Sequence, residues 1–132
     1  MNVARAAGVY VLITFAAGFV WGTLRTVVSA PAWGALPAVA LEIPVMFAVA
    51  WWASARALRW APIPAGAGPA LAMGAVFFGL LQGAELALRF AVSGGVMETV
   101  LAAYAAPEAL IGIAAQALTA LFPLGHVLRN RP

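Results

Sequence analysis

Four ionisable residues fall inside apolar stretches of this 132-residue sequence, where charged side chains are rare. They are two arginines and two glutamates: Arg25, Glu42, Glu85 and Arg89. Glu85 and Arg89 are spaced i,i+4, so they would share one face of a helix. A charge in hydrocarbon costs about 2.5–3.5 kcal/mol even on the lenient insertion scale, which disfavours exposure to lipid. We therefore predict that the four side chains face one another inside a bundle, at similar depth, where two cations and two anions balance.

Polar and small residues recur at helical spacing around these charges and predict a shared interior. The supporting polar residues are Gln82, Gln116 and Thr119, and the predicted helix-packing residues are Gly18, Gly22, Gly79 and Gly83. Small residues allow membrane helices to approach closely, and polar side chains can hydrogen-bond between helices. The glycines form two GxxxG pairs, for which we favour a role in packing.

The composition places the chain in a lipid bilayer. Hydrophobic residues make up 65% of it, charged residues 8%, and the mean hydropathy is +1.01. Soluble domains carry about 45–50% apolar and about 25% charged residues, so this chain cannot cover a globule with polar surface. The net charge of +3 comes from scattered arginines rather than from one basic face. A soluble enzyme and a nucleic-acid-binding module are thereby excluded.

Four apolar segments can be delimited, at about residues 6–29, 38–58, 69–92 and 107–128. Each has 20 or more residues, which is enough to cross a hydrocarbon core of about 30 Å as a helix. Backbone groups in lipid must be satisfied within the segment, so helices are expected. The sequence predicts an all-α fold: one integral membrane domain over residues 1–132, built as a bundle of four transmembrane helices.

The connections between the segments are less uniform. Residues 30–37, with two prolines, are expected to form a loop, whereas residues 96–106 are either a short interfacial helix or an overlong start of the fourth segment. The first apolar run continues through Val28 with no short hydrophobic region and cleavage site, so we expect a retained helix rather than a signal peptide.

Pro44 and Pro123 each free a carbonyl four residues earlier. For Pro123 we favour a kink covered by neighbouring helices, and for Pro44 a cavity-lining carbonyl remains an equal alternative.

The arginines predict the orientation of the chain. Five of them flank one side of the predicted bundle: Arg5, Arg56, Arg59, Arg129 and Arg131. The opposite connections, residues 30–37 and 93–106, contain no arginine, so both termini are expected in the cytoplasm. The use of arginine without lysine, together with abundant alanine, glycine and proline, is typical of a GC-rich bacterial genome. We expect a multi-pass protein of the bacterial inner membrane, with the lipid bilayer as its first partner and no nucleic acid.

The remaining polar residues indicate no catalytic or metal site. The chain has no cysteine, which excludes disulfides and thiolate ligands, and its single histidine cannot supply two axial haem ligands. We expect no cofactor and no metal. His126 and Tyr104 are expected at the membrane interfaces, and Glu108 as a solvated acid at a helix N-terminus. Because no nucleophile or His–acid arrangement is present, the protein is not predicted to be an enzyme.

Several strings in the sequence resemble a family of short four-helix bacterial inner-membrane proteins. They are GFVWGTLR over residues 18–25, LEIPVM over 41–46, and the spaced residues Pro107, Gly112, Gln116 and Pro123. The resemblance covers most of the chain. It implies the membrane location and the four-helix fold, and it implies no activity.

Two functions from different classes follow. In the first, the protein passes protons, cations or a small solute through a periplasm-facing charged pocket. Because four helices leave little room for an alternating-access site, this function predicts a homo-oligomer or a larger membrane complex. In the second, the protein is a non-catalytic accessory or lipid-associated subunit whose buried ion pairs are structural. Two observations would distinguish transport from the accessory role. They are a water-filled pocket, and a flux that changes in a Glu42→Gln variant without a change in folding.

Overall fold

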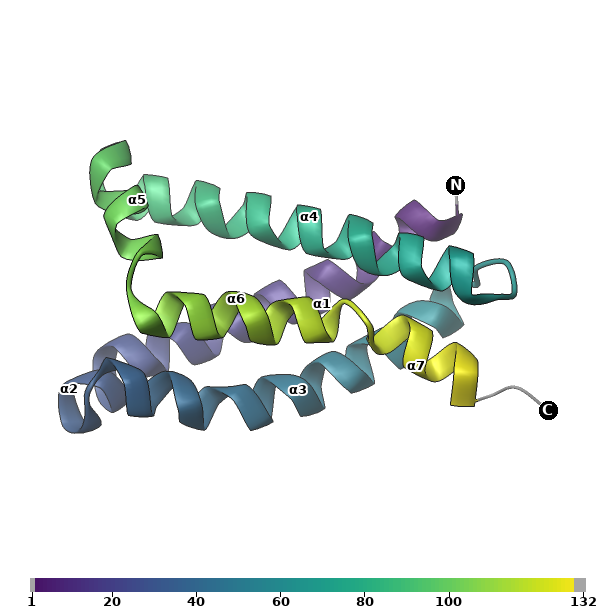
Figure 1. Ribbon diagram of the computed structural model, residues 1–132, viewed down its shortest axis with the longest axis horizontal. Coiled ribbons are helices and arrows are strands. Elements are labelled where there is room, and N and C mark those ends of the chain that lie inside the picture. The colour runs from purple at the N-terminus through teal and green to yellow at the C-terminus, as the bar shows by residue number, and fades with distance from the viewer. Residues whose placement is uncertain (1, 130–132) are drawn as a thin grey trace.

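A computed structural model describes residues 2–129 as a bundle of helices, with no strand in that range (Figure 1). The helices, in chain order, are α1 (Asn2–Leu24), η1 (Arg25–Ser29), α2 (Ala30–Trp33), α3 (Ala35–Trp60), α4 (Ala67–Val92), α5 (Met97–Tyr104), α6 (Pro107–Thr119) and α7 (Phe122–Arg129). Four helical stretches are long and apolar enough to cross a membrane: Asn2–Trp33, Ala35–Trp60, Ala67–Val92 and Pro107–Arg129. The all-α fold with four candidate membrane-spanning helices is therefore confirmed.

The two ends of the bundle differ in which segments they gather. In Figure 1, α2 and α5 lie at one end, whereas the start of α1, the α3–α4 connection and the end of α7 lie at the other. Helix α1 packs against both α3 and α4, and α7 packs against the same two helices. We call the end with α2 and α5 the open end and the opposite end the closed end. Arg131, which was expected on the side of the termini, lies outside the described residues.

The expected loop over residues 30–37 is wrong, because the chain is helical almost throughout it. Pro31 lacks an N–H, and its ring crowds the carbonyl of Val27, four residues earlier. That carbonyl lies in η1, where the helix widens into a π-helical turn. Pro37 falls in the first turn of α3, where a missing N–H costs no helical bond. Only Gly34 breaks the helix, with a φ of 92° that glycine adopts readily.

Residues 96–106 fold as the first of the two alternatives, a separate short helix. Helix α5 begins at Met97, and α6 begins independently at Pro107, a favoured first helical residue. Two glycines with positive φ, Gly94 at 75° and Gly95 at 84°, reverse the chain after α4. After this turn α5 lies at the open end of the bundle, between the end of α4 and the start of α6, as Figure 1 shows.

The closed end is packed around small side chains. Its fully buried members include alanines from α1 and α3 and larger residues from α4: Ala6, Ala7, Ala50, Ala53, Ala57, Met73 and Phe77. The rings of Tyr10 and Phe77 stack with centroids 3.8 Å apart. Alanines let helices approach closely, so van der Waals packing is the main attraction between these helices in lipid.

A break between α6 and α7 is explained by Pro123. The proline cannot donate to the carbonyl of Thr119, four residues earlier. The hydroxyl of Tyr10 donates to that carbonyl instead, at 2.6 Å, so a neighbouring helix satisfies the freed group. This is the covered kink that the sequence favoured for Pro123. The fourth span is thus two helices rather than one.

His126, for which a membrane interface was expected, is buried in the packing of α7 against α3. Its side chain is 8% exposed and stacks on the ring of Trp51, with centroids 3.8 Å apart. Its Nε2 lies 3.0 Å from the carbonyl oxygen of Trp51, to which it can donate. The aromatic stack explains the burial, because it covers the imidazole while the carbonyl accepts its polar edge.

The outer surface of the long helices is apolar. Large hydrophobic side chains are exposed on α1 and α4, among them Leu12 at 71%, Val20 at 62% and Val92 at 79%. Contiguous apolar surface on this scale marks a face that meets something other than water. The surface is consistent with a multi-pass membrane protein.

Gly74 offers a direct test of the closed end. A Cβ at this buried position of α4 would lie 1.9 Å from the carbonyl oxygen of Ala120, at the α6–α7 break. We expect Gly74→Ala to lower the free energy of unfolding by about 3 kcal/mol or more, because the backbone must move to relieve the overlap. Gly68→Ala is the matched control on the same helix, since a Cβ there meets nothing within 4 Å. Thermal unfolding in detergent micelles, followed by tryptophan fluorescence, would contradict this packing if both variants behaved alike.

Candidate functional site

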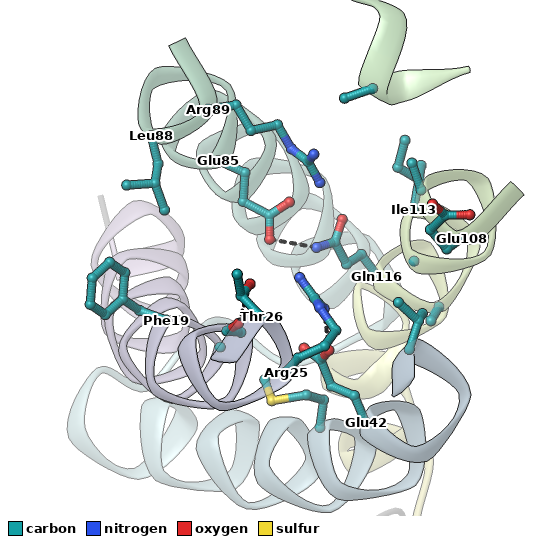
Figure 2. A pocket seen from close by; sticks show the side chains of 18 of the residues that line it. Phe19, Arg25, Thr26, Glu42, Glu85, Leu88, Arg89, Glu108, Ile113 and Gln116 are labelled. Atoms are coloured by element: carbon teal, nitrogen blue, oxygen red, sulfur yellow. Dashed lines mark hydrogen bonds and ion pairs between the residues drawn. The ribbon is translucent and has the colours of Figure 1, made fainter. Parts of the chain in front are cut away.

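A cavity of about 1070 Å³ occupies the open end of the bundle. Its walls come from α1, η1, α3, α4, α5 and α6, so segments from the whole length of the chain meet there. The four charges predicted to converge, Arg25, Glu42, Glu85 and Arg89, all line it. Figure 2 shows Arg25, Glu85 and Arg89 pointing toward one another across the space between their helices.

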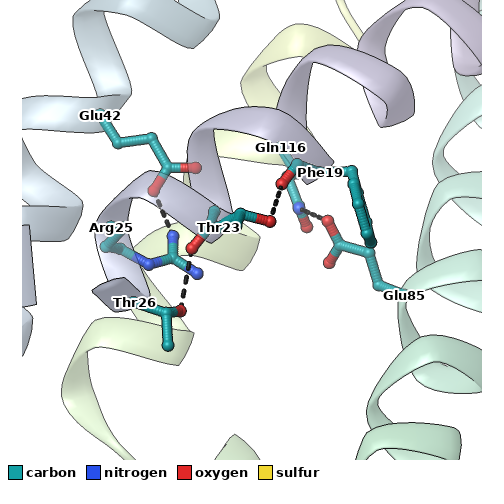
Figure 3. Close-up of polar contacts among 8 residues, drawn as sticks. Phe19, Thr23, Arg25, Thr26, Glu42, Glu85 and Gln116 are labelled. Atoms are coloured by element: carbon teal, nitrogen blue, oxygen red, sulfur yellow. Dashed lines mark hydrogen bonds and ion pairs between the residues drawn. The ribbon is translucent and has the colours of Figure 1, made fainter. Parts of the chain in front are cut away.

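Arg25 and Glu42 form an ion pair between η1 and α3. The guanidinium Nη1 of Arg25 donates to Oε2 of Glu42, as Figure 3 shows. The arginine side chain is 31% exposed and that of Glu42 only 14%, so the pair is largely shielded by the protein. Arg25 is the first residue of the π-helical turn, a feature that is frequent at functional sites. The pair joins the helical stretches that precede and follow the Gly34 break.

Glu85 pairs with an amide rather than with an arginine. The Nε2 of Gln116, on α6, donates to Oε1 of Glu85 at 2.6 Å, and its Oε1 accepts from Nε2 of Gln82 at 2.5 Å. Gln82 and Glu85 lie almost one turn apart on α4, so Gln116 bridges α6 to α4 through both ends of its amide. Thr119, the third supporting polar residue, turns back on its own helix and donates to the carbonyl of Gln116 at 2.6 Å.

Arg89 faces an aromatic ring instead of a carboxylate. Its guanidinium carbon lies 4.9 Å from the centroid of the Tyr104 ring on α5, a cation–π distance. Among residues 2–129, Arg25 and Glu42 form the only ion pair with a nitrogen–oxygen distance within 4.0 Å. The structure therefore gathers the four predicted charges around one cavity but does not join them into one ion-pair network.

Two residues of the site were missed by the sequence analysis. Tyr104, expected as an interface anchor, holds the guanidinium of Arg89, and Glu108, expected to be solvated, is half-buried and lines the cavity. Both depend on α5, which turns back over the open end and delivers the first turn of α6 to the cavity. No spacing rule connects residues 104 and 108 with Arg89, so only the three-dimensional path of the chain reveals them.

The predicted packing glycines divide into two groups. Gly18 and Gly22 lie on the cavity side of α1, where a Cβ would be 3.7 Å from the end of Met46 and from the guanidinium of Arg25, respectively. Gly79 and Gly83 on α4 are exposed, and a Cβ on either meets nothing within 4 Å. Among residues 2–129 the second pair therefore packs against no helix, and the packing role favoured for it from the sequence finds no support there.

The Arg25–Glu42 pair predicts a measurable coupling between the two residues. Removing either partner leaves the other charge shielded and unpaired, so Arg25→Gln and Glu42→Gln should each destabilise the protein. The double variant should recover part of the loss, giving a coupling free energy of about 0.5–3 kcal/mol in a double-mutant cycle. Chemical unfolding in mixed micelles measures all four proteins. Strictly additive effects would show that the two side chains do not interact.

The chemistry of the cavity is that of carboxylates and guanidinium groups held near apolar walls. In the described part of the chain, no group of three or more His, Asp or Glu side chains is placed to hold a metal ion. Comparisons with protein-family models, with curated proteins and with solved structures found no match for this chain.

Proposed function

We propose that this protein is a small multi-pass protein of the bacterial inner membrane that passes protons, cations or a small solute through the charged cavity. The observation that carries the proposal is the cavity itself, which collects five ionisable side chains at one end of four apolar helices: Arg25, Glu42, Glu85, Arg89 and Glu108. Ionisable groups at membrane depth are expensive, and they mark ion and substrate pathways in membrane proteins.

The distribution of arginine supports an orientation with the cavity in the periplasm. Arg5, Arg56, Arg59 and Arg129 lie toward the closed end, near the start of α1, the end of α3 and the end of α7. The connections at the open end carry none. By the positive-inside rule the closed end and both termini are cytoplasmic, and the cavity opens to the other side.

The packing of the closed end supports an oligomer as the working unit. The alanine-rich core around Tyr10 and Phe77 leaves those residues fully buried, so one copy of the chain offers a chamber rather than a continuous path. Gly79 and Gly83 present an exposed small-residue surface on α4, suited to close approach by a second membrane helix. In this proposal the path is completed between copies or within a larger membrane complex.

The second function, a non-catalytic accessory or lipid-associated subunit, is favoured by one specific observation. Arg25 and Glu42 neutralise each other in a shielded pair, as structural ion pairs do. The other charged side chains of the cavity, Glu85, Arg89 and Glu108, have no such ion-pair partner among residues 2–129. For that reason we place transport first.

Glu85 provides the sharpest test of transport. Unlike Glu42, it has a neutral partner, and a glutamine in its place can still accept the hydrogen bond of Gln116. In proteoliposomes with imposed pH, Na⁺ or K⁺ gradients, or with a labelled neutral amino acid inside, we expect Glu85→Gln to lower the flux at least tenfold at unchanged thermal stability.

The matched control is Glu98→Gln, which removes a carboxylate at an exposed position of α5 that does not line the cavity. Flux through this variant should equal that of the unmodified protein. If the unmodified protein carries no flux under any of these gradients, transport is contradicted, and the accessory function takes its place.

A further inference from the structure

Three charged side chains of the cavity have no oppositely charged partner in residues 2–129. Arg25 and Glu42 neutralise each other, which leaves Arg89, Glu85 and Glu108. Arg89 stacks over Tyr104, and Glu85 accepts one hydrogen bond from a neutral amide. The cavity therefore presents one cation and two carboxylates whose charges the protein itself does not balance.

The cation and the nearest carboxylate are placed for a ligand that carries both signs. Glu85 and Arg89 lie on the same face of α4, roughly 6 Å apart along the helix axis. A guanidinium presents a planar fork of N–H donors that matches the oxygens of a carboxylate or phosphate. A carboxylate in turn accepts hydrogen bonds from an ammonium group. Anionic and cationic ligands would each satisfy only one side of this arrangement.

The cavity is also deeper and more apolar than an ion requires. Phe15, Phe47 and Leu81 line it toward the closed end. Leu81 precedes Arg89 by eight residues on α4, so its Cα lies roughly 12 Å along the helix axis from that of Arg89. The volume of about 1070 Å³ matches pockets that take whole organic molecules. The charged side chains thus have a deep apolar stretch of cavity beside them on the closed-end side, which suits an amphiphile.

We infer that the cavity binds a zwitterion with an anionic oxygen group, an ammonium group and an apolar portion. Arg89 holds the oxygens, Glu85 faces the ammonium, and the apolar portion lies toward Leu81. The same chemistry is found in an ethanolamine phospholipid from the bilayer and in a free amino acid with an apolar side chain. The inference rests on the proposed function in one respect, because it names the class of the small solute.

Two binding measurements on the purified full chain distinguish the sources. In the first, the protein is placed in nanodiscs containing equal amounts of phosphatidylethanolamine and phosphatidylglycerol, and the retained lipid is identified by native mass spectrometry. A preference of at least tenfold for the ethanolamine lipid identifies a lipid ligand. In the second, labelled leucine is titrated into the protein in detergent, and its binding is compared with that of labelled 4-methylpentanoate, which is leucine without the amino group. Saturable binding of leucine alone identifies a free amino acid.

Substitutions in the cavity should abolish whichever binding is found. We expect Arg89→Gln and Glu85→Gln each to weaken it at least tenfold. Arg59→Gln and Glu98→Gln remove the same charges at exposed positions outside the cavity and should leave it unchanged. Arg89→Lys retains the charge without the planar fork, and we expect it to fold and to bind several-fold more weakly.

The inference is overturned if the two lipids are retained equally and leucine does not bind, or if the cavity variants bind as well as the controls. Its failure is separable from that of the proposed function, because binding and flux are measured independently. Selective binding without flux contradicts transport alone. A proton or cation flux without either ligand contradicts the zwitterion alone.

Discussion

The cost of holding ionisable side chains at membrane depth organises this molecule. Each such charge would cost about 2.5–3.5 kcal/mol if it faced lipid, so the helices must turn these side chains inward. Once inward, each finds a partner of a different kind. Arg25 meets the carboxylate of Glu42, Glu85 meets the amide of Gln116, and Arg89 meets the ring of Tyr104. These contacts link the helices at the open end, around the cavity.

At the closed end the same helices pack closely against one another instead of enclosing charged side chains. There α1 carries Ala6 and Ala7 in place of charges, and Gly74 on α4 allows the carbonyl of Ala120 to approach closely. The kink at Pro123 would leave the buried carbonyl of Thr119 without a hydrogen bond if Tyr10 did not donate to it. One half of the bundle is therefore packed through small residues, with the carbonyl freed by Pro123 hydrogen-bonded to Tyr10, and the other half encloses a chamber.

Hydropathy and the cost of buried charge were sufficient to predict the helical class, the four apolar spans and the gathering of Arg25, Glu42, Glu85 and Arg89 around one space. The pairing of those charges was not predictable, because it depends on how each helix is rotated about its axis. The π-helical turn at Arg25 changes that rotation, and a regular helical period does not contain it. Tyr104 and Glu108 were missed because the fold of α5 over the open end sets their position, and the sequence left residues 96–106 ambiguous.

The central claim is that this chamber opens to one side of the membrane and is sealed toward the other. The chain has no cysteine, so a single introduced thiol reports access without interference. Gly22→Cys places it in the cavity and Ala53→Cys in the closed-end core. With a membrane-impermeant maleimide applied to intact cells, the account predicts that Gly22→Cys reacts and that Ala53→Cys reacts from neither side until the protein unfolds. A Gly22→Cys thiol that reacts only from the cytoplasmic side, or not at all, would contradict it.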